Sequence, residues 1–184
     1  MVRATLGLSP WDVLHQGVAT RTSLSIGAST VAISIVVLLL WIPLRQRVGL
    51  GTLSNGLFIG VFVDLWLLVL PETRSMAPRV ALVVAGVVLN GVATGLYIGA
   101  GLGPGPRDGL MTGLAARGRS VRLVRTAVEL LALALGWILG GTVGVGTLLY
   151  ALGIGPIAHV TIPHFTRPGH TEDRPRLEPF PTPE

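Results

Sequence analysis

Long apolar stretches separated by short charged segments constrain this chain more than any other feature. Half of its 184 residues are hydrophobic, 12% are charged, and the mean hydropathy is +0.68. A soluble domain carries about 25% charged residues, whereas a helix of about 20 apolar residues crosses the hydrocarbon core of a bilayer. The sequence therefore predicts an all-α, polytopic membrane protein whose spanning helices have the lipid bilayer as their partner.

Five stretches are long and apolar enough to cross a bilayer as helices. They are residues 24–43, 51–70, 79–100, 121–140 and 143–161. Two further stretches, at about 10–20 and within 101–120, follow Gly and Pro residues and are too short to cross. We therefore expect a bundle of five spanning helices with two short, non-spanning helical stretches.

The arginines predict how these spans are oriented, because Arg and Lys accumulate in short cytoplasmic loops. The chain has no Lys, so every strong cation is Arg. With five spans, the loop at 44–50, the segment at 101–121 and the C-terminal tail share one side of the membrane. That side and the adjacent helix start at 122–125 carry seven arginines before the tail, against four on the other side. We predict that the C-terminal tail is cytoplasmic.

A sequence repeat runs through the chain at an offset of 95 to 96 residues. Residues 6–21 (LGLSPWDVLHQGVATR) match residues 102–117 (LGPGPRDGLMTGLAAR) at eight of sixteen positions. Residues 49–60 (GLGTLSNGLFIG) match residues 144–155 (GVGTLLYALGIG) at seven of twelve. Because the shared letters include Pro, Asp, Thr and Arg, apolar bias alone does not explain the match. The sequence predicts a first repeat at 1–70, a second repeat at 71–161, and a disordered, Pro-rich tail at 162–184.

The two predicted repeats differ at their beginnings. A full span, 79–100, precedes the second motif copy, whereas residues 1–5 alone precede the first. Units of three spans would lie in opposite orientations, as in many secondary transporters. Either the natural protein begins upstream of Met1 and has six spans, or the ancestral first span was lost. We expect the upstream start, because loss of one helix would expose the packing surfaces of its neighbours to lipid.

Composition and motifs exclude several classes of function. The absence of Cys excludes disulfide scaffolds and Cys-ligated metal centres. The net charge of +5 arises from arginines beside apolar spans, without a basic stripe of interleaved aromatics, so no nucleic-acid partner is expected. The GLGPG stretch at 101–105 is not read as a phosphate-binding turn, since it contains Pro104 and lies in a membrane chain. No catalytic or metal-ligand motif is evident, so we predict no enzyme, no metal and no cofactor.

The motif LGLSPWDVLHQG, the GLGTL stretch and the second copy LGPGPRDGLMTGL together resemble the YczE-like bacterial integral membrane proteins, which are loosely related to the YitT family. The resemblance covers nearly the whole chain except the tail. Members of that family usually have a span before the first motif, which this chain lacks. The resemblance implies a multi-pass protein of the bacterial cytoplasmic (inner) membrane, and it implies no catalytic residues.

The repeated acidic residues Asp12 and Asp108 follow Pro10 and Pro106 at equivalent positions. As a functional pair they would face a cavity or bind a cation at two helix breaks. As structural residues they would neutralise free N–H groups in the first helical turn. We favour the structural interpretation, and the two are compatible.

Asp64 and Glu129 lie within predicted spans, where ionisable residues are costly and raise a functional hypothesis by default. Each could bind a proton or a cationic solute. Alternatively, Asp64 lies near the span end and reaches the interface, and Glu129 pairs with Arg125 one turn away. The sequence leaves both readings of Asp64 open and favours pairing for Glu129.

Polar side chains without a charge complete the set of candidates. Asn55 and Asn90 are expected to hydrogen-bond between helices, which is the commoner role for a lone amide in a span. His159, near the end of the last span, is expected to be an ordinary interfacial residue.

Two functions fit these patterns. The first is a small transporter or permease-like protein whose path for a small molecule or ion lies where the repeats meet. The alternative is a regulatory or scaffold protein that acts through helix–helix contacts. Neutralising Asp64 and Glu129 should impair a transporter and spare a scaffold. The sequence identifies no substrate and leaves homo-oligomerisation open.

Overall fold

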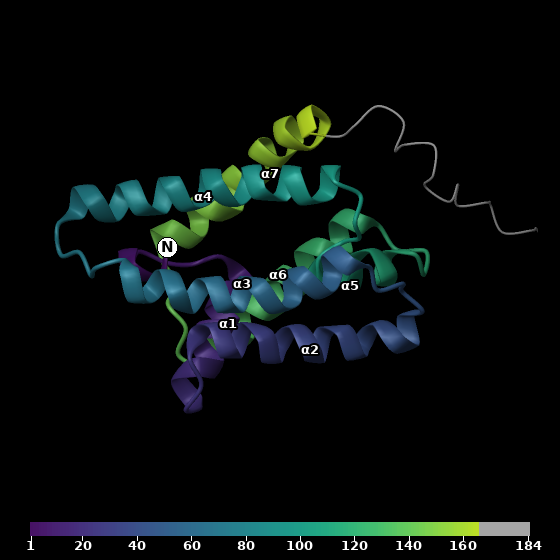
Figure 1. Cartoon of the computed structure of the whole chain (residues 1–184), viewed down its shortest axis with the longest axis horizontal. Coiled ribbons are helices and arrows are strands. Elements are labelled where there is room, and N and C mark those ends of the chain that lie inside the picture. Colours follow the sequence, from purple (N-terminus) through teal and green to yellow (C-terminus); the bar gives the residue numbers. More distant parts are fainter. Residues whose placement is uncertain (166–184) are drawn as a thin grey trace, which may run out of the picture.

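The protein is all-helical in the part of the chain that the structure, a computed structural model, describes, residues 1–165 (Figure 1). Seven α-helices follow a short 3-10 turn at Val2–Ala4, and these residues contain no strand. The helices are α1 (Pro10–Arg21), α2 (Ile26–Leu44), α3 (Leu50–Val69), α4 (Met76–Gly99), α5 (Pro106–Ala115), α6 (Val121–Ile138) and α7 (Val145–Phe165). The predicted fold class, all-α, is confirmed.

Four of the described helices are long and apolar enough to cross a membrane: α2, α3, α4 and α7. They coincide with four of the five predicted spans. The remaining stretch, 121–140, forms α6, which has 18 residues and includes Arg122, Arg125 and Glu129. Because of these three charged residues, α6 is less apolar than the four spanning helices. The predicted number of five spans is therefore not confirmed.

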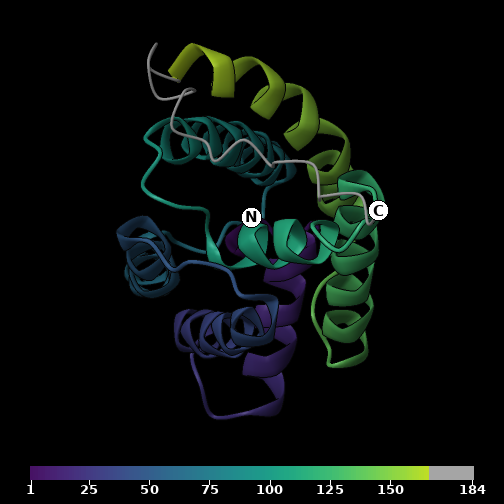
Figure 2. The same cartoon turned by 90° about the vertical axis from the view of Figure 1, so that its right-hand side faces the viewer.

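The apolar helices α2, α3 and α4 run alongside one another, and α7 crosses α4 obliquely (Figure 1). Figure 2 looks nearly along the axes of α2, α3 and α4, with α7 curving over α4. α4 packs mainly against α7, α1 against α6, and α2 against both α3 and α5. Helices from the beginning and the end of the chain are therefore interleaved in one bundle.

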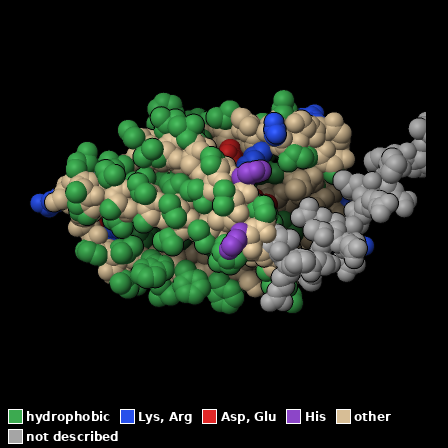
Figure 3. Space-filling view, turned by 90° about the horizontal axis from the view of Figure 1, so that it is seen from above, with side chains coloured by type: hydrophobic (Ala, Val, Ile, Leu, Met, Phe, Trp, Pro, Cys, Tyr) green, Lys and Arg blue, Asp and Glu red, His purple; other side chains and the backbone are tan. Residues whose placement is uncertain are grey.

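Two clusters of buried side chains hold this bundle together. One lies where α1, α2, α5 and α6 meet and contains Trp11, Trp41 and Leu110. The other lies between α4, α7 and the N-terminal turn and contains Val83 and Tyr150. Many large apolar side chains of α2, α3, α4, α6 and α7 remain exposed, and hydrophobic atoms cover much of the face seen in Figure 3. Such a surface is expected of helices that contact lipid.

The end of the last helix corrects one predicted boundary. α7 continues to Phe165, so residues 162–165 are helical, although the sequence analysis assigned them to a disordered tail. The apolar residues of α7 extend its helix through Pro163, which lies inside it. The rest of the predicted tail, 166–184, lies outside the described residues.

The two copies of the motif adopt matching local conformations. Gly7 and Gly103 both have positive φ, at 115° and 111°. Three residues later, Pro10 and Pro106 each occupy the first position of a short helix. Pro suits this position because its missing N–H has no partner to lose there. The shared Gly and Pro therefore produce the same turn into a helix at both places.

The motif copies also make matching contacts with the apolar helices. The Gly51 N–H at the start of α3 donates to Leu102 O at 3.0 Å, and the Gly146 N–H at the start of α7 donates to Leu6 O at 2.7 Å. Each motif copy thus binds the beginning of a helix from the other half of the sequence. The two halves are interlocked through these equivalent backbone hydrogen bonds.

Candidate solute-binding cavity

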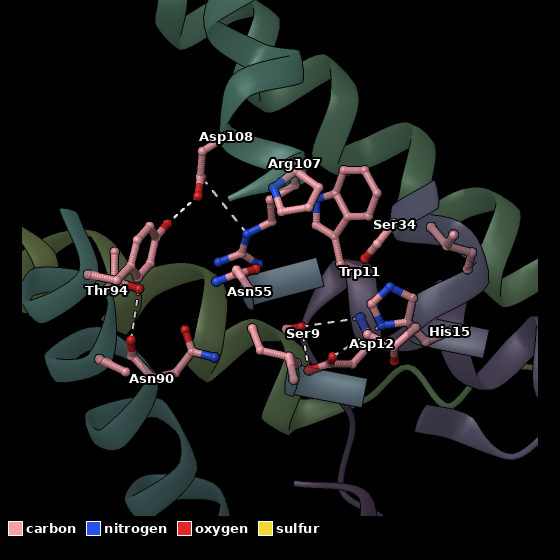
Figure 4. A pocket seen from close by; sticks show the side chains of 16 residues that line it. Ser9, Trp11, Asp12, His15, Ser34, Asn55, Asn90, Thr94, Arg107 and Asp108 are labelled. Atoms are coloured by element: carbon pink, nitrogen blue, oxygen red, sulfur yellow. Dashed lines mark hydrogen bonds and ion pairs between the residues drawn. The ribbon is translucent and has the colours of Figure 1, made fainter. Parts of the chain in front are cut away.

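A cavity of about 340 Å³ lies where the first turns of α1 and α5 approach α2, α3 and α4. Its polar lining is shown in Figure 4. The lining residues are Ser9, Trp11, Asp12, His15, Thr30, Ile33, Ser34, Asn55, Ile59, Asn90, Ala93, Thr94, Tyr97, Pro106, Arg107 and Asp108. Three of the five residues proposed from the sequence, Asp12, Asn90 and Asp108, therefore share one cavity.

The first turn of α1 supplies an acid and its partners. Ser9 is the N-cap residue, and its hydroxyl accepts from the Asp12 N–H at 3.3 Å and donates to Asp12 Oδ2 at 2.6 Å. His15, one turn further, places Nδ1 3.5 Å from Asp12 Oδ1. Asp12 lies in the first turn, as predicted, although Ser9 rather than Asp12 caps the helix, and the Asp12 side chain also lines the cavity.

The electrostatic surroundings of Asp12 favour its ionised form. Burial acts to raise the pKa of Asp12, but the interactions with His15 and Ser9 and the positive charge of Arg107 outweigh it. The pKa of Asp12 therefore lies below its ordinary value. Asp12 is an anion at neutral pH.

The first turn of α5 supplies a second acid and a cation. Asp108 Oδ2 accepts a hydrogen bond from the Tyr97 hydroxyl of α4, and Asp108 Oδ1 lies 3.8 Å from Arg107 Nε. Trp41 of α2 positions this turn, because its buried indole N–H donates to Pro106 O at 3.0 Å. Asp108 thus occupies the predicted first turn of its helix and also lines the cavity.

Arg107 remains a cation in this setting. Burial acts to lower the pKa of Arg107, but interactions with Tyr150, Asp108 and Tyr97 outweigh it and hold the pKa above its ordinary value. Figure 4 shows the side chain extending from α5 toward Asn55. The cavity therefore contains a permanent positive charge beside two carboxylates.

The amides add hydrogen-bonding groups from two apolar helices. The Asn90 side-chain oxygen accepts from the Tyr150 hydroxyl of α7 at 3.4 Å, which confirms the predicted contact between helices. Asn90 O also accepts from the Thr94 hydroxyl at 2.8 Å. Asn55 of α3 lines the cavity, and its amide has no hydrogen-bond partner within residues 1–165.

Asp64 and Glu129 lie outside the lining of the cavity. The Asp64 carboxylate caps α2, accepting from the Ser25 hydroxyl and from the Gly27 N–H at 2.8 Å. An anion at a helix N-terminus is stabilised by the free N–H groups and the helix dipole. Glu129 accepts from Arg125 at 3.2 Å, so its predicted pairing is confirmed. Since neither residue lines the cavity, a functional test belongs at the cavity instead.

Sequence reasoning missed Arg107 and Trp11 as site residues. In the sequence, Arg107 contributes to the orientation signal, and no pattern assigns a role to Trp11. A signal was present, because the two residues occupy equivalent positions in the motif, each immediately before its repeated Asp. Both line the cavity. Within residues 1–165, no group of three or more His, Asp and Glu side chains is placed to hold a metal ion.

Comparison with known proteins places the chain among bacterial membrane proteins of unknown function. An uncharacterised protein of Haemophilus influenzae (strain Rd) is 42% identical over 158 residues, which is 85% of this chain and 72% of the relative. The uncharacterised membrane protein YczE of Bacillus subtilis is 36% identical over 160 residues, 86% of this chain and 74% of YczE. The uncharacterised protein YyaS of the same organism is 32% identical over 169 residues, 88% of this chain and 83% of YyaS.

No solved structure matches the chain significantly. The model of a family of unknown function, DUF6198, matches residues 1–163. This match and the similarity to YczE confirm the resemblance drawn from the Leu-Gly-x-x-Pro-x-Asp motifs, and the apolar helices agree with a membrane location. The chain therefore belongs to the DUF6198 family and is a helical membrane protein related to YczE.

Proposed function

We propose that this protein is a small transporter, built from two repeat units of opposite orientation, that moves a small solute through the cavity between them. The observation that carries the proposal is that the first turns of α1 and α5, from the two motif copies, meet at one charged cavity. Secondary transporters with internal repeats bind their solutes where the repeats meet. The solute would cross chemically unchanged, so no catalytic role is assigned.

The matching local geometry supports the repeat. Gly7 and Gly103 share a positive φ, and Leu6 and Leu102 accept equivalent hydrogen bonds from the other half. Thr52 and Thr147, which are also equivalent, each accept from the N–H of a Gly three residues earlier at 3.3 Å. These paired features are expected if both halves descend from one unit.

Opposite orientation of the units requires α6 to cross the membrane as a fifth span. In Figure 1 the loop between α2 and α3 lies at the right-hand end, whereas the equivalent loop between α6 and α7 lies toward the left. The Arg125–Glu129 ion pair reduces the charge that α6 would bring into the bilayer. We place the protein in the bacterial inner membrane with the α2–α3 loop and the C-terminus cytoplasmic.

Access to the cavity from both sides of the membrane tests transport without knowledge of the solute. The chain has no Cys, so Ser34→Cys introduces a single thiol into the cavity lining with little change in size. We expect a membrane-impermeant thiol reagent to label this variant from either side of oriented vesicles, because a transporter exposes its site alternately. The labelled fraction is measured by intact mass.

A matched variant separates cavity access from general reactivity. Leu152→Cys places the thiol on α7 at a side chain that is 67% exposed and faces lipid in our account, so it should stay unlabelled. Labelling of Ser34→Cys from one side alone would contradict transport and favour the regulatory or scaffold alternative.

A further inference from the structure

We propose that the cavity selects a small solute that carries an oxyanion, such as a carboxylate or phosphate, which Arg107 and Trp11 hold between them. This inference deepens the proposed function and rests on it for its biological meaning. The binding itself is a separate property, and it can be measured without transport.

Two hydrogen-bond donors line the cavity from equivalent positions of the two motif copies. Arg107 carries a permanent positive charge with several N–H donors, and Trp11 carries one indole N–H. Both side chains line the cavity (Figure 4). The Trp11 residue is 7% exposed, and its Nε1 is buried without a hydrogen-bond partner. A buried donor without a partner is destabilising, and a bound acceptor would satisfy it.

The two carboxylates of the cavity already have partners. Asp108 accepts from the Tyr97 hydroxyl and lies beside Arg107. Asp12 accepts from the Ser9 hydroxyl and lies beside His15. Three lining side chains keep polar atoms without a hydrogen-bond partner within the described residues: the Trp11 N–H, which can only donate, the Asn55 amide, which can donate and accept, and His15 Nδ1. A bound cation would have to compete with the existing partners of the two carboxylates. A bound oxyanion would accept hydrogen bonds from the Trp11 N–H and the Asn55 amide N–H groups.

The size of the cavity fits a small solute. The cavity volume of about 340 Å³ lies at the lower end of the roughly 300 to 1,000 Å³ of ligand sites. It accommodates a small polar solute with part of its hydration. The charged and hydrogen-bonding side chains of the lining favour a hydrophilic solute over a lipid chain.

Thermal stability of the purified, detergent-solubilised full chain tests binding. The probes are sodium succinate, sodium phosphate and the neutral isostere succinamide, with sodium chloride at matched ionic strength. We expect succinate or phosphate to raise Tm by about 3 to 6 °C at about tenfold above Kd, and succinamide and chloride to leave it unchanged. No response to either oxyanion at 50 mM, or an equal response to succinamide or chloride, would overturn the proposal.

Variants locate the site. Arg107→Gln should abolish the rise in Tm, and Trp11→Phe should weaken binding by about tenfold, because it removes one hydrogen bond to a charged group. Arg74→Gln makes the same charge change at an exposed position of the loop between α3 and α4 and should keep the full response. If Arg107→Gln fails to fold, the Trp11→Phe titration decides the question. An unchanged affinity in the variant tested would overturn the assignment.

Binding and transport can fail separately. Stabilisation by succinate or phosphate together with one-sided labelling of Ser34→Cys would keep the oxyanion site and refute transport. Two-sided labelling without any oxyanion response would refute the oxyanion site and leave the transport proposal intact.

Discussion

Replacing Gly136 with Ala should disrupt the crossing of α1 and α6 and leave little correctly folded protein. A Cβ at Gly136 would lie 2.5 Å from the carbonyl carbon of Val13 and 2.6 Å from Leu14 Cα. These atoms belong to the backbone of α1, so no side-chain rotation relieves the clash. Overpacking costs about 1–3 kcal/mol and occasionally more, and we expect a loss above about 3 kcal/mol because two backbones must separate.

A second glycine provides the control for this experiment. A Cβ at Gly155, in α7, would meet no atom within 4 Å. Gly155→Ala should be neutral or stabilising by up to about 1 kcal/mol, since Ala favours a helix over Gly. The free energies of unfolding in mixed micelles are compared. Equal stability of Gly136→Ala and Gly155→Ala would contradict the close crossing of α1 and α6.

Replacing Gly109 with Ala should displace α5 and, with it, the charged turn of the cavity. A Cβ at Gly109 would lie 2.7 Å from Trp41 Cε2 and closer still to two other ring atoms. Trp41 is 1% exposed and holds Pro106 O through its indole N–H, so it has little room to move. We expect a loss of about 3 kcal/mol together with loss of oxyanion binding at the neighbouring Arg107.

The partner of Gly109 can be changed in turn. Trp41→Phe removes the indole atoms that would clash with a Cβ at position 109, and it also removes the hydrogen bond to Pro106 O. As a single variant, Trp41→Phe should lose about 1–3 kcal/mol of the free energy of unfolding. The double variant should lose less free energy of unfolding than the sum of the losses in the two single variants, because the smaller Phe ring leaves room for the Cβ at position 109. Strictly additive losses in the free energy of unfolding would show that Trp41 and Gly109 are not in contact.

Much of the fold followed from local signals in the sequence. Apolar length predicted α2, α3, α4 and α7, and Gly followed by Pro predicted the starts of both short helices. The boundary of α6 was also close, but whether it crosses the bilayer depends on the surroundings of its charges. The end of α7 was predicted too early because the Pro-rich composition of 162–184 indicates a disordered tail, whereas α7 continues to Phe165.

The candidate site was only partly predictable, because it depends on contacts between distant segments. The repeated Asp12 and Asp108 were found, since equivalent positions stand out in an aligned repeat. Arg107 resembled any loop arginine, and its role emerges only where α5 approaches α3 and α4. Asp64 was ambiguous for the same reason, because its partners on α2 lie 37 and 39 residues away.

The arrangement of two oppositely oriented halves around the cavity is most directly tested at the equivalent loops that follow α2 and α6. Arg47→Cys and Val143→Cys place single thiols at exposed positions of these loops, and an impermeant reagent is applied to each side of the membrane. Our account predicts labelling of Arg47→Cys from the cytoplasmic side and of Val143→Cys from the opposite side. Labelling of both from the same side would show that α6 does not cross, and it would contradict the inverted arrangement on which the proposed transport path depends.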